Sequence, residues 1–356
     1  MIRPFFDRIP TLIAVVWLPF FVRPSVPVQQ PQSGAPTAQF EMMPPENGLK
    51  LARAKESVLK LSLEGSELKA EPPLSSGPVT FPHYVRELVQ LKWRPMDPID
   101  LWVIRPAGVK KPPVVLYLYG YPSETDRFHD VRVCQRLVQG GAAAVGFVSA
   151  LTGHRYGHRP LKEWFVSELP EALATTVHDV QMILNYLATR GDLDMSRVGM
   201  FGQGSGGAIA ILAAATDPRI KVVDLLNPWG DWPDWLAKAS IVPTDERAPY
   251  LQPDFLKRLE PLEPVHFLLA LESRIIRIQF FDDDGNAPKE TADKLTAAAP
   301  VTAKISHYPN ARASFAASGG APLFEWIATA LKPPTEKIEK KDDAAKMSTA
   351  ATARWH

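Results

Sequence analysis

The segment 197–211 contains the residues whose types and spacing could most directly carry chemistry. It reads Arg-Val-Gly-Met-Phe-Gly-Gln-Gly-Ser-Gly-Gly-Ala-Ile-Ala-Ile. A short apolar strand runs into a glycine-rich turn and then into a helix of small residues, with Ser205 at the start of that helix. A serine at such a turn could act as a nucleophile if a histidine accepted its proton and a carboxylate oriented the histidine.

This turn resembles the nucleophile elbow of the α/β-hydrolase family, whose pattern is Gly-x-Ser-x-Gly. If Gly202 and Gly206 fill the two small positions, Gly204 fills the central one, and the nucleophile is missing. Glycine adopts the positive φ of the turn without strain, so the turn could keep its shape. The alternative register makes Ser205 the nucleophile but puts Gln203 where the family has a small residue. A phosphate-binding loop is a third interpretation, although the segment lacks the lysine of a P-loop.

The resemblance extends to the sequence Tyr-Gly-Tyr-Pro at 119–122, where the family often has His-Gly after a buried strand. It implies that the backbone N–H groups of Tyr121 and Ser205 are the oxyanion-hole donors. We therefore expect Tyr119 and Gly120 to lie at the pocket.

Three tryptophans follow the apolar run 221–226 at helical spacing: Trp229, Trp232 and Trp235. Such a stripe usually belongs to a core. Strand ends in this type of fold face the ligand crevice, however, so we also expect Trp229 and Trp232 to line the pocket.

The acid of the family follows a later strand, as Asp, three residues and Pro. Here the run 282–288 reads Asp-Asp-Asp-Gly-Asn-Ala-Pro, so the resemblance implies Asp284 as the acid and Asp283 as the alternative. The family base lies in Tyr-Pro-Gly-Ala-Gly-His-Gly-Phe. This chain has Tyr-Pro-Asn-Ala-Arg-Ala-Ser-Phe at 308–315, so Ala313 takes the place of the histidine.

Other histidines could replace the missing base. His307 precedes Ala313 within the expected strand 303–308, and His154 and His158 lie in a loop rich in Gly and Arg. A packed or surface role is the simpler interpretation for all three. The loop histidines would form a metal pair only on a helix, and the Gly and Pro content argues against one there.

The elements that must position these residues alternate along the chain. We expect strands at 85–93, 99–105, 113–119, 142–149, 197–201, 221–226, 274–281 and 303–308, and helices at 130–139, 170–189, from 205, at 289–298 and at 323–331. This alternation predicts a largely parallel sheet with helices on both faces. The resemblance, strongest to dienelactone hydrolases, acetyl xylan esterases and prolyl oligopeptidases, implies an α/β-hydrolase fold with eight strands. The stretch 236–272 predicts a small helical insertion after strand six.

The two ends of the chain differ from this central domain at 81–331. Residues 1–22 predict a signal peptide or an N-terminal membrane anchor, because the apolar run 9–22 follows Arg3 and Arg8. Residues 23–80 indicate a proline-rich linker with a short helix, and 332–356 a disordered charged tail. We therefore expect an exported protein that is periplasmic, secreted or membrane-anchored.

The composition of the chain limits the classes of partner and cofactor that it could bind. The net charge is +1, with 40 basic and 39 acidic residues, which gives no basic surface for nucleic acid. The single cysteine, Cys134, excludes an internal disulfide and a cysteine-rich metal site, and we expect a buried structural thiol and no metal or cofactor. The losses at Gly204 and Ala313 together predict a catalytically impaired hydrolase that binds a small acyl or ester ligand or a protein. An active serine hydrolase using Ser205, Asp284 and a displaced histidine is the alternative.

Overall fold

Runs of apolar residues that alternate with helix-forming segments give this chain one mixed sheet. The computed structural model describes residues 56–57, 60–95, 97–152, 155, 165–319 and 324–332. Within these ranges a ten-stranded sheet has the order β1-β3-β4-β6-β5-β7-β8-β9-β10, and β2 pairs with β3. The strands are β1 (Leu74–Ser75), β2 (Val79–Thr80), β3 (Tyr84–Leu91), β4 (Ile99–Pro106), β5 (Pro113–Leu118), β6 (Ala143–Phe147), β7 (Asp194–Gln203), β8 (Ile220–Leu226), β9 (Ile275–Phe281) and β10 (Lys304–Tyr308).

The sheet is mostly parallel, as the sequence predicted. Strands β5 to β10 run parallel to one another, whereas β4 is antiparallel to both β3 and β6. The expected number of eight strands is too low, because it omits β1 and β2. These two strands are two residues long and exposed, so they show no apolar alternation that could reveal them.

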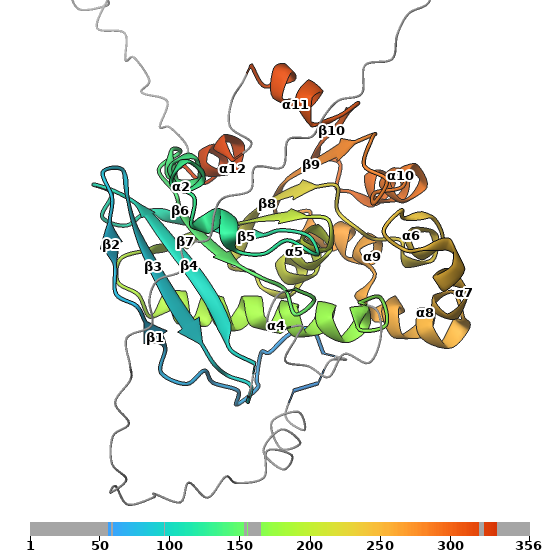
Figure 1. The fold of residues 1–356 in the computed structure, drawn as a ribbon, viewed down its shortest axis with the longest axis horizontal. Coiled ribbons are helices and arrows are strands. Elements are labelled where there is room, and N and C mark those ends of the chain that lie inside the picture. Colours follow the sequence, from blue (N-terminus) through green and yellow to red (C-terminus); the bar gives the residue numbers. More distant parts are fainter. Residues whose placement is uncertain are drawn as a thin grey trace, which may run out of the picture. The chain divides into compact units, whose positions relative to one another are not determined.

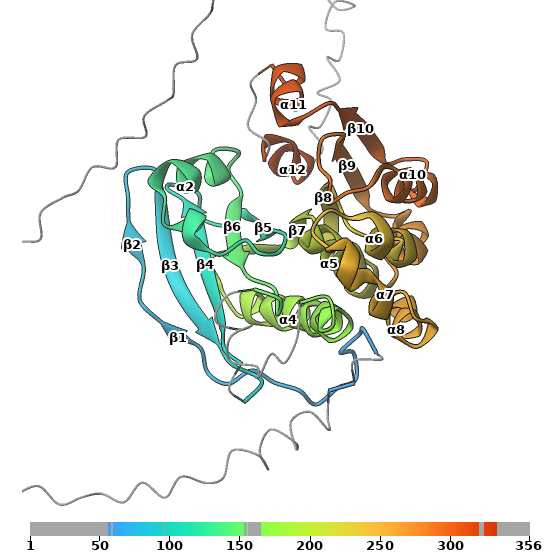
Figure 2. The ribbon, with the colours of Figure 1, turned by 45° about the vertical axis from the view of Figure 1, so that its right-hand side comes forward.

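Helices cover both faces of the sheet, with α2 and α12 on one face and α4 and α5 on the other (Figures 1 and 2). The helices are α2 (Val131–Val138), α4 (Leu169–Ala188), α5 (Ser205–Thr216), α6 (Trp232–Lys238), α7 (Arg247–Tyr250), α8 (Pro253–Leu259), α9 (Pro264–Leu268), α10 (Lys289–Ala298), α11 (Ala311–Ala317) and α12 (Glu325–Ala330). Helices α6 to α9 lie between β8 and β9 in the chain, so the helical insertion is where the sequence predicted it.

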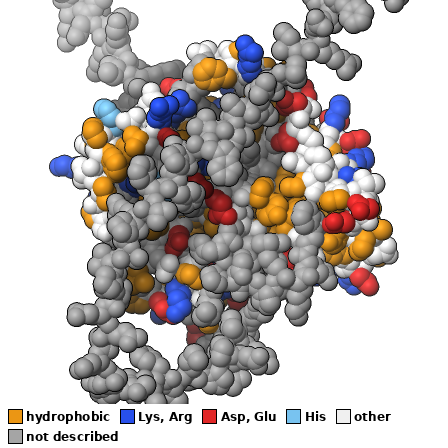
Figure 3. Space-filling view, in the orientation of Figure 1, with side chains coloured by type: hydrophobic (Ala, Val, Ile, Leu, Met, Phe, Trp, Pro, Cys, Tyr) orange, Lys and Arg blue, Asp and Glu red, His pale blue; other side chains and the backbone are white. Residues whose placement is uncertain are grey.

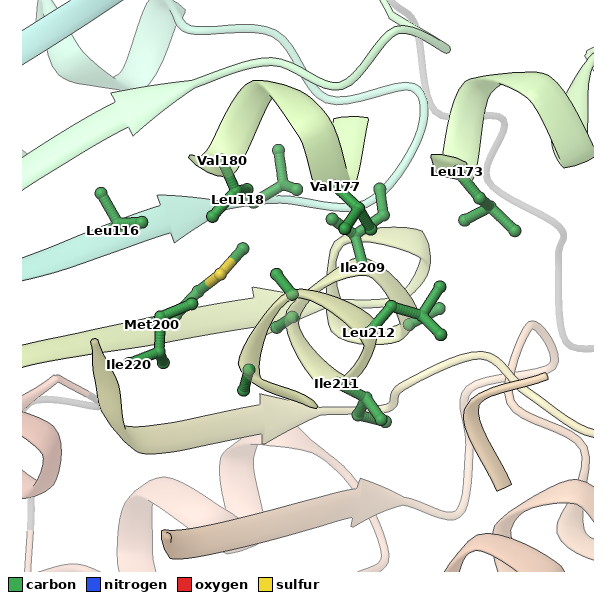
Figure 4. Packing of buried hydrophobic residues seen from close by; sticks show 14 of the residues in the cluster. Leu116, Leu118, Leu173, Val177, Val180, Met200, Ile209, Ile211, Leu212 and Ile220 are labelled. Carbon is green, nitrogen blue, oxygen red and sulfur yellow. The ribbon is translucent and has the colours of Figure 1, made fainter. Parts of the chain in front are cut away.

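The centre of the larger hydrophobic core lies between the sheet and α4. Helix α5 is buried from Ser205 to Ala214, which is expected of a helix that is apolar or small on every side. Figure 4 shows Val177 of α4, Leu118 of β5 and Ile209 of α5, which belong to one hydrophobic cluster. These contacts fix the helix that begins at the glycine-rich turn.

The folded domain begins earlier in the chain than residue 81. Leu61 is buried in the core, and β1 and β2 extend the sheet from within the range 23–80 that we expected to be linker. The Gln181 side chain on α4 holds this segment, because its Nε2 donates to the Leu61 carbonyl and its Oε1 accepts from the Leu63 N–H. The boundary was missed because the segment gains its apolar and hydrogen-bonding partners only in the folded chain.

A buried ionic cluster also ties this segment to α4. Arg94 and Arg155 both contact Asp179, with nitrogen–oxygen distances of 2.5 and 2.8 Å. Arg94 further binds Glu56, and Arg155 further binds Asp97. These side chains are at most 13% exposed, and a buried charge without a partner would be strongly destabilising. The cluster therefore fixes the position of Glu56.

His178 completes the cluster. Its Nδ1 lies 2.7 Å from Glu56 Oε1, and its Nε2 lies 2.7 Å from the Lys60 carbonyl oxygen. Both ring nitrogens of His178 are therefore engaged, one by a carboxylate and one by a backbone carbonyl. His178 and the two arginines thus surround the three carboxylates.

Charged side chains of both signs are interspersed with apolar ones on the face shown in Figure 3. This agrees with a net charge of +1. In the part of the chain that the structure describes, every helix is too short or too polar to cross a membrane. The expected signal or anchor at 1–22 and the tail beyond 332 lie outside the described residues.

Glu56 predicts a dependence of stability on acidic pH. Burial raises the pKa of Glu56, but hydrogen bonds from Arg94 and His178 outweigh burial and lower the pKa from 4.5 to about 2. Its contribution is therefore fully present above the unfolded pKa and is lost as the pH falls towards the folded pKa. We expect the free energy of unfolding to decrease by on the order of 3 kcal/mol over this interval.

Urea denaturation at a series of pH values measures this loss. In Glu56→Gln the curve should be flatter between about pH 4.5 and pH 2, because the group that titrates is gone. Equal slopes for the two proteins would contradict the assigned role of Glu56.

Candidate active site at the turn between β7 and α5

The turn between β7 and α5 consists of Gly204 alone. Gly204 has φ 55° and ψ −120°, a conformation that residues with a Cβ rarely adopt. Its N–H donates to the Leu226 carbonyl at the end of β8, and its own carbonyl accepts from Gly207 N and Trp229 N, all at 3.0 Å. The turn is thus fixed to both the end of β8 and the first turn of α5.

Glycines on either side of the turn permit the close approach of strand and helix. A Cβ added to Gly202 would lie 2.3 Å from the Gly206 carbonyl oxygen, and one added to Gly206 would lie 2.2 Å from the Leu118 carbonyl oxygen. A Cβ on Gly207 would lie 2.8 Å from Pro228 Cα. Gly202 and Gly206 have the least room for a side chain, which is the spacing of the register centred on Gly204, and Gly207 also lacks room.

The Ser205 side chain faces backbone rather than a cleft. Ser205 is fully buried, and its Oγ accepts a hydrogen bond of 2.9 Å from the Tyr121 N–H. Tyr121 N–H is one of the two groups that we expected to stabilise an oxyanion. The serine hydroxyl therefore occupies a donor that a substrate oxygen would need.

The carboxylate of Asp284 is held by an amide. Asn227 Nδ2 donates to Asp284 Oδ2 at 2.6 Å, and the Asn286 N–H donates to Oδ1 at 2.9 Å. Asp284 is half-buried at the end of β9, whereas the alternative, Asp283, is exposed. The Asn227 amide can donate hydrogen bonds but cannot serve as a base at neutral pH.

Asn227 is a site residue that sequence reasoning missed. It is buried, has φ 45° and joins the ends of two strands, because its N–H donates to Gln279 O and its Oδ1 accepts from Phe281 N. The sequence signal that could have identified Asn227 was its position directly after β8. An asparagine there can adopt the left-handed conformation and hydrogen-bond locally.

The expected position of the base lies on a helix. Ala313 is in the first turn of α11, and its N–H donates to Oδ1 of Asn310, which caps the helix. We had not expected a helix between 308 and 323. The asparagine cap and the alanines explain it, because both favour helix formation.

His307 lies on the edge strand β10, away from the turn. Its side chain is 44% exposed, its ring stacks on Phe280, and its Nδ1 is 3.9 Å from Asp282 Oδ1. Strands β8 and β9 separate β10 from β7, which corresponds to roughly 14 Å at the usual strand spacing. His307 is therefore not placed to accept a proton from Ser205. His154 and His158 lie outside the described residues.

Aromatic rings fill the space in front of Gly204. A Cβ on Gly204 would lie 3.3 Å from Trp229 Nε1, and Trp229 itself packs on Trp235 with a centroid distance of 4.4 Å. Next to them, Tyr121 stacks on Phe165 at 4.1 Å. A side chain at position 204 would therefore contact the Trp229 indole.

The residues that we expected at the pocket have different surroundings. Tyr119 is buried between Phe128 and Phe201, and Gly120 lies against the Gln203 carbonyl. Trp229 is 2% exposed. Trp232 lines a cavity of about 520 Å³ that α6, α8 and α9 form.

The described residues contain no group of three or more His, Cys, Asp and Glu side chains that could hold a metal ion. Cys134 is fully buried on α2, and its Sγ lies 3.1 Å from the Phe128 carbonyl oxygen. This is the environment of a structural thiol.

The close approach of α5 to β5 predicts a large cost for Gly206→Ala. The new Cβ would overlap backbone, which cannot yield as a flexible side chain can, so we expect the free energy of unfolding to fall by about 3 kcal/mol. Gly191→Ala is a matched control, because nothing lies within 4 Å of its added Cβ, and it should change stability by less than about 1 kcal/mol. Chemical denaturation of the two variants measures both values, and similar losses would contradict the account of the turn.

No protein-family model matches the chain, and no curated protein matches it. Solved structures do resemble it. Acetyl xylan esterase 1 from Thermoanaerobacterium sp. JW/SL YS485 aligns with 79% of this chain and 93% of its own, at 15% identity and a TM-score of 0.53. The acetyl xylan esterase from Paenibacillus sp. R4 aligns with 74% of this chain and 85% of its own, at 16% identity and a TM-score of 0.53. A methylesterase aligns with 80% of this chain and 62% of its own, at 16% identity and a TM-score of 0.54. Together with the order of the strands and the glycine-rich turn, these similarities show that the chain has the α/β-hydrolase fold.

Proposed function

We propose that this protein is an α/β-hydrolase-fold protein that has lost acyl-transfer catalysis and acts by binding a ligand or a partner. The observation that carries the proposal is the hydrogen bond from Tyr121 N–H to the buried Ser205 Oγ. It engages the Ser205 hydroxyl and one expected oxyanion donor in the same contact. A nucleophile must instead face the substrate and have a base within reach.

The other two positions support the same proposal. Ala313 supplies no imidazole, and the described hydrogen bonds join no histidine to Ser205 or Asp284. Asp284 is engaged by Asn227, so it orients an amide rather than a base. Where the nucleophile and the base of a catalytic triad are missing, only a residual acceleration of roughly 10³–10⁴ over water is expected.

The class of ligand is suggested by the proteins that share the fold. The titles of the similar structures name acetyl xylan esterases and a methylesterase. A small acyl or ester compound, or a protein partner, is accordingly part of the proposal. Export to the periplasm, the cell surface or the medium is also proposed, from the pattern of residues 1–22.

An active serine hydrolase is the competing function, and the shared fold with esterases is what favours it. It would use Ser205 and Asp284 with a displaced histidine such as His307, His154 or His158. Ser205 Oγ would first have to leave the Tyr121 N–H and become exposed. That movement would cost a buried hydrogen bond.

Ester turnover and active-site labelling separate the two functions. With p-nitrophenyl acetate the protein should turn over more slowly than about 1 s⁻¹, which is the low end of ordinary enzymes. A fluorophosphonate probe should add no mass, because no activated hydroxyl is available to it.

Ser205→Ala is the matched control for both measurements. It should leave any residual ester hydrolysis unchanged, because we place Ser205 in the structure of the turn and not in the chemistry. Stoichiometric phosphonylation of Ser205, or a turnover that Ser205→Ala abolishes, would overturn the proposal and favour the active hydrolase.

A further inference from the structure

A cavity lies on the α12 side of the sheet, separate from the filled space in front of Gly204. It has a volume of about 560 Å³, within the usual range for small-molecule sites. The sheet wall is formed by Arg277, Gln279 and Phe281, which share one face of β9 because they alternate along the strand. Helices α11 and α12 form the opposite wall. The helix that replaces the expected histidine segment thus also shapes this cavity.

The sheet wall presents an unpaired hydrogen-bond donor. Gln279 is 3% exposed, and its Nε2 has no hydrogen-bond partner. Buried polar groups are nearly always paired, and an unpaired one is destabilising. Gln279 lines the cavity, although its Nε2 itself has almost no accessible surface, so a ligand oxygen would accept the missing hydrogen bond once the amide turns towards the cavity.

The charges around the cavity select against an anion. Arg277 donates from Nε and Nη2 to the two oxygens of the fully buried Asp224, at 2.8 and 2.6 Å, so its charge is balanced. Glu325 adds a carboxylate to the lining. A carboxylate ligand would therefore meet no net positive charge.

The remaining surface suits an apolar body. Trp326 packs against the Arg277 guanidinium with its ring centre 4.6 Å away, and Phe315 lines the cavity although it is 61% exposed. Aromatic side chains of this kind favour flat apolar ligands.

We propose that this cavity binds a neutral, largely apolar molecule through a carbonyl oxygen that accepts a hydrogen bond from Gln279 Nε2. A ketone or an ester has this chemistry. The inference goes beyond the proposed loss of catalysis and does not depend on it, because the cavity is built by other residues than the turn.

Titration of the full chain with prodan tests the proposal. Prodan is a neutral naphthyl ketone whose emission shifts on binding, and it cannot be hydrolysed, so esterase activity would not disturb the measurement. We expect saturable binding. Gln279→Met keeps the size of the side chain but removes the donor, and it should weaken binding about 5-fold to 10-fold.

A second pair of variants tests the location. Ser314 is 8% exposed on the wall formed by α11, so Ser314→Phe should fill the cavity and abolish saturable binding. Ala316→Phe adds the same ring at an exposed position of α11 outside the lining and should bind prodan as the unmodified protein does. Unchanged binding in both Gln279→Met and Ser314→Phe, or no saturable binding at all, would overturn the proposal.

Competition tests the chemical class. Ethyl hexanoate should displace prodan, whereas hexanoate at the same concentration and neutral pH should not, because its carboxylate is charged. Equal displacement by the ester and the anion would contradict the proposed selection for a neutral carbonyl.

Discussion

Contact between the backbones of β7 and α5 is the constraint on which the rest of the structure depends. A Cβ on Gly202 of β7 would overlap the Gly206 carbonyl of α5, so strand and helix lie in contact and are joined by one residue with positive φ. Gly204 satisfies this requirement without a side chain. The same contact carries Ser205 into the first turn of the buried helix α5 and places its Oγ at the Tyr121 N–H. The fold and the buried position of Ser205 thus have the same geometric origin.

Polar groups around the turn are paired with one another, and this pairing stabilises the arrangement. Ser205 accepts from Tyr121, Asn227 donates to Asp284, and Asn310 caps the helix that contains Ala313. A catalytic centre keeps its donors oriented towards the substrate at some cost in stability. Here the Tyr121 N–H and the Asp284 carboxylate are engaged within the protein, and the Trp229 indole lies next to Gly204. The binding that we propose uses a surface other than this turn.

Much of the fold and of the glycine-rich turn could be predicted from the sequence, because the patterns that specify them are local. The strands, the helical insertion and the close packing at Gly202 and Gly206 follow from apolar runs and glycine spacing. The partner of Asp284 could not be predicted, because the ends of β8 and β9 meet only in the sheet. Helix α11 was missed because the family resemblance suggested a loop where Asn310 in fact caps a helix. The cluster around Asp179 joins residues from four separate segments, and no single stretch of sequence shows it.

Hydrogen exchange at the Tyr121 amide, followed by NMR in the unmodified protein and in Ser205→Ala, tests the central claim most directly. The account predicts slow exchange in the unmodified protein, because Ser205 Oγ holds this N–H in a buried hydrogen bond, and clearly faster exchange once the hydroxyl is removed. Equal exchange rates in the two proteins would show that the hydroxyl is not engaged there. The claim that Ser205 is committed to the structure of the turn would then be wrong.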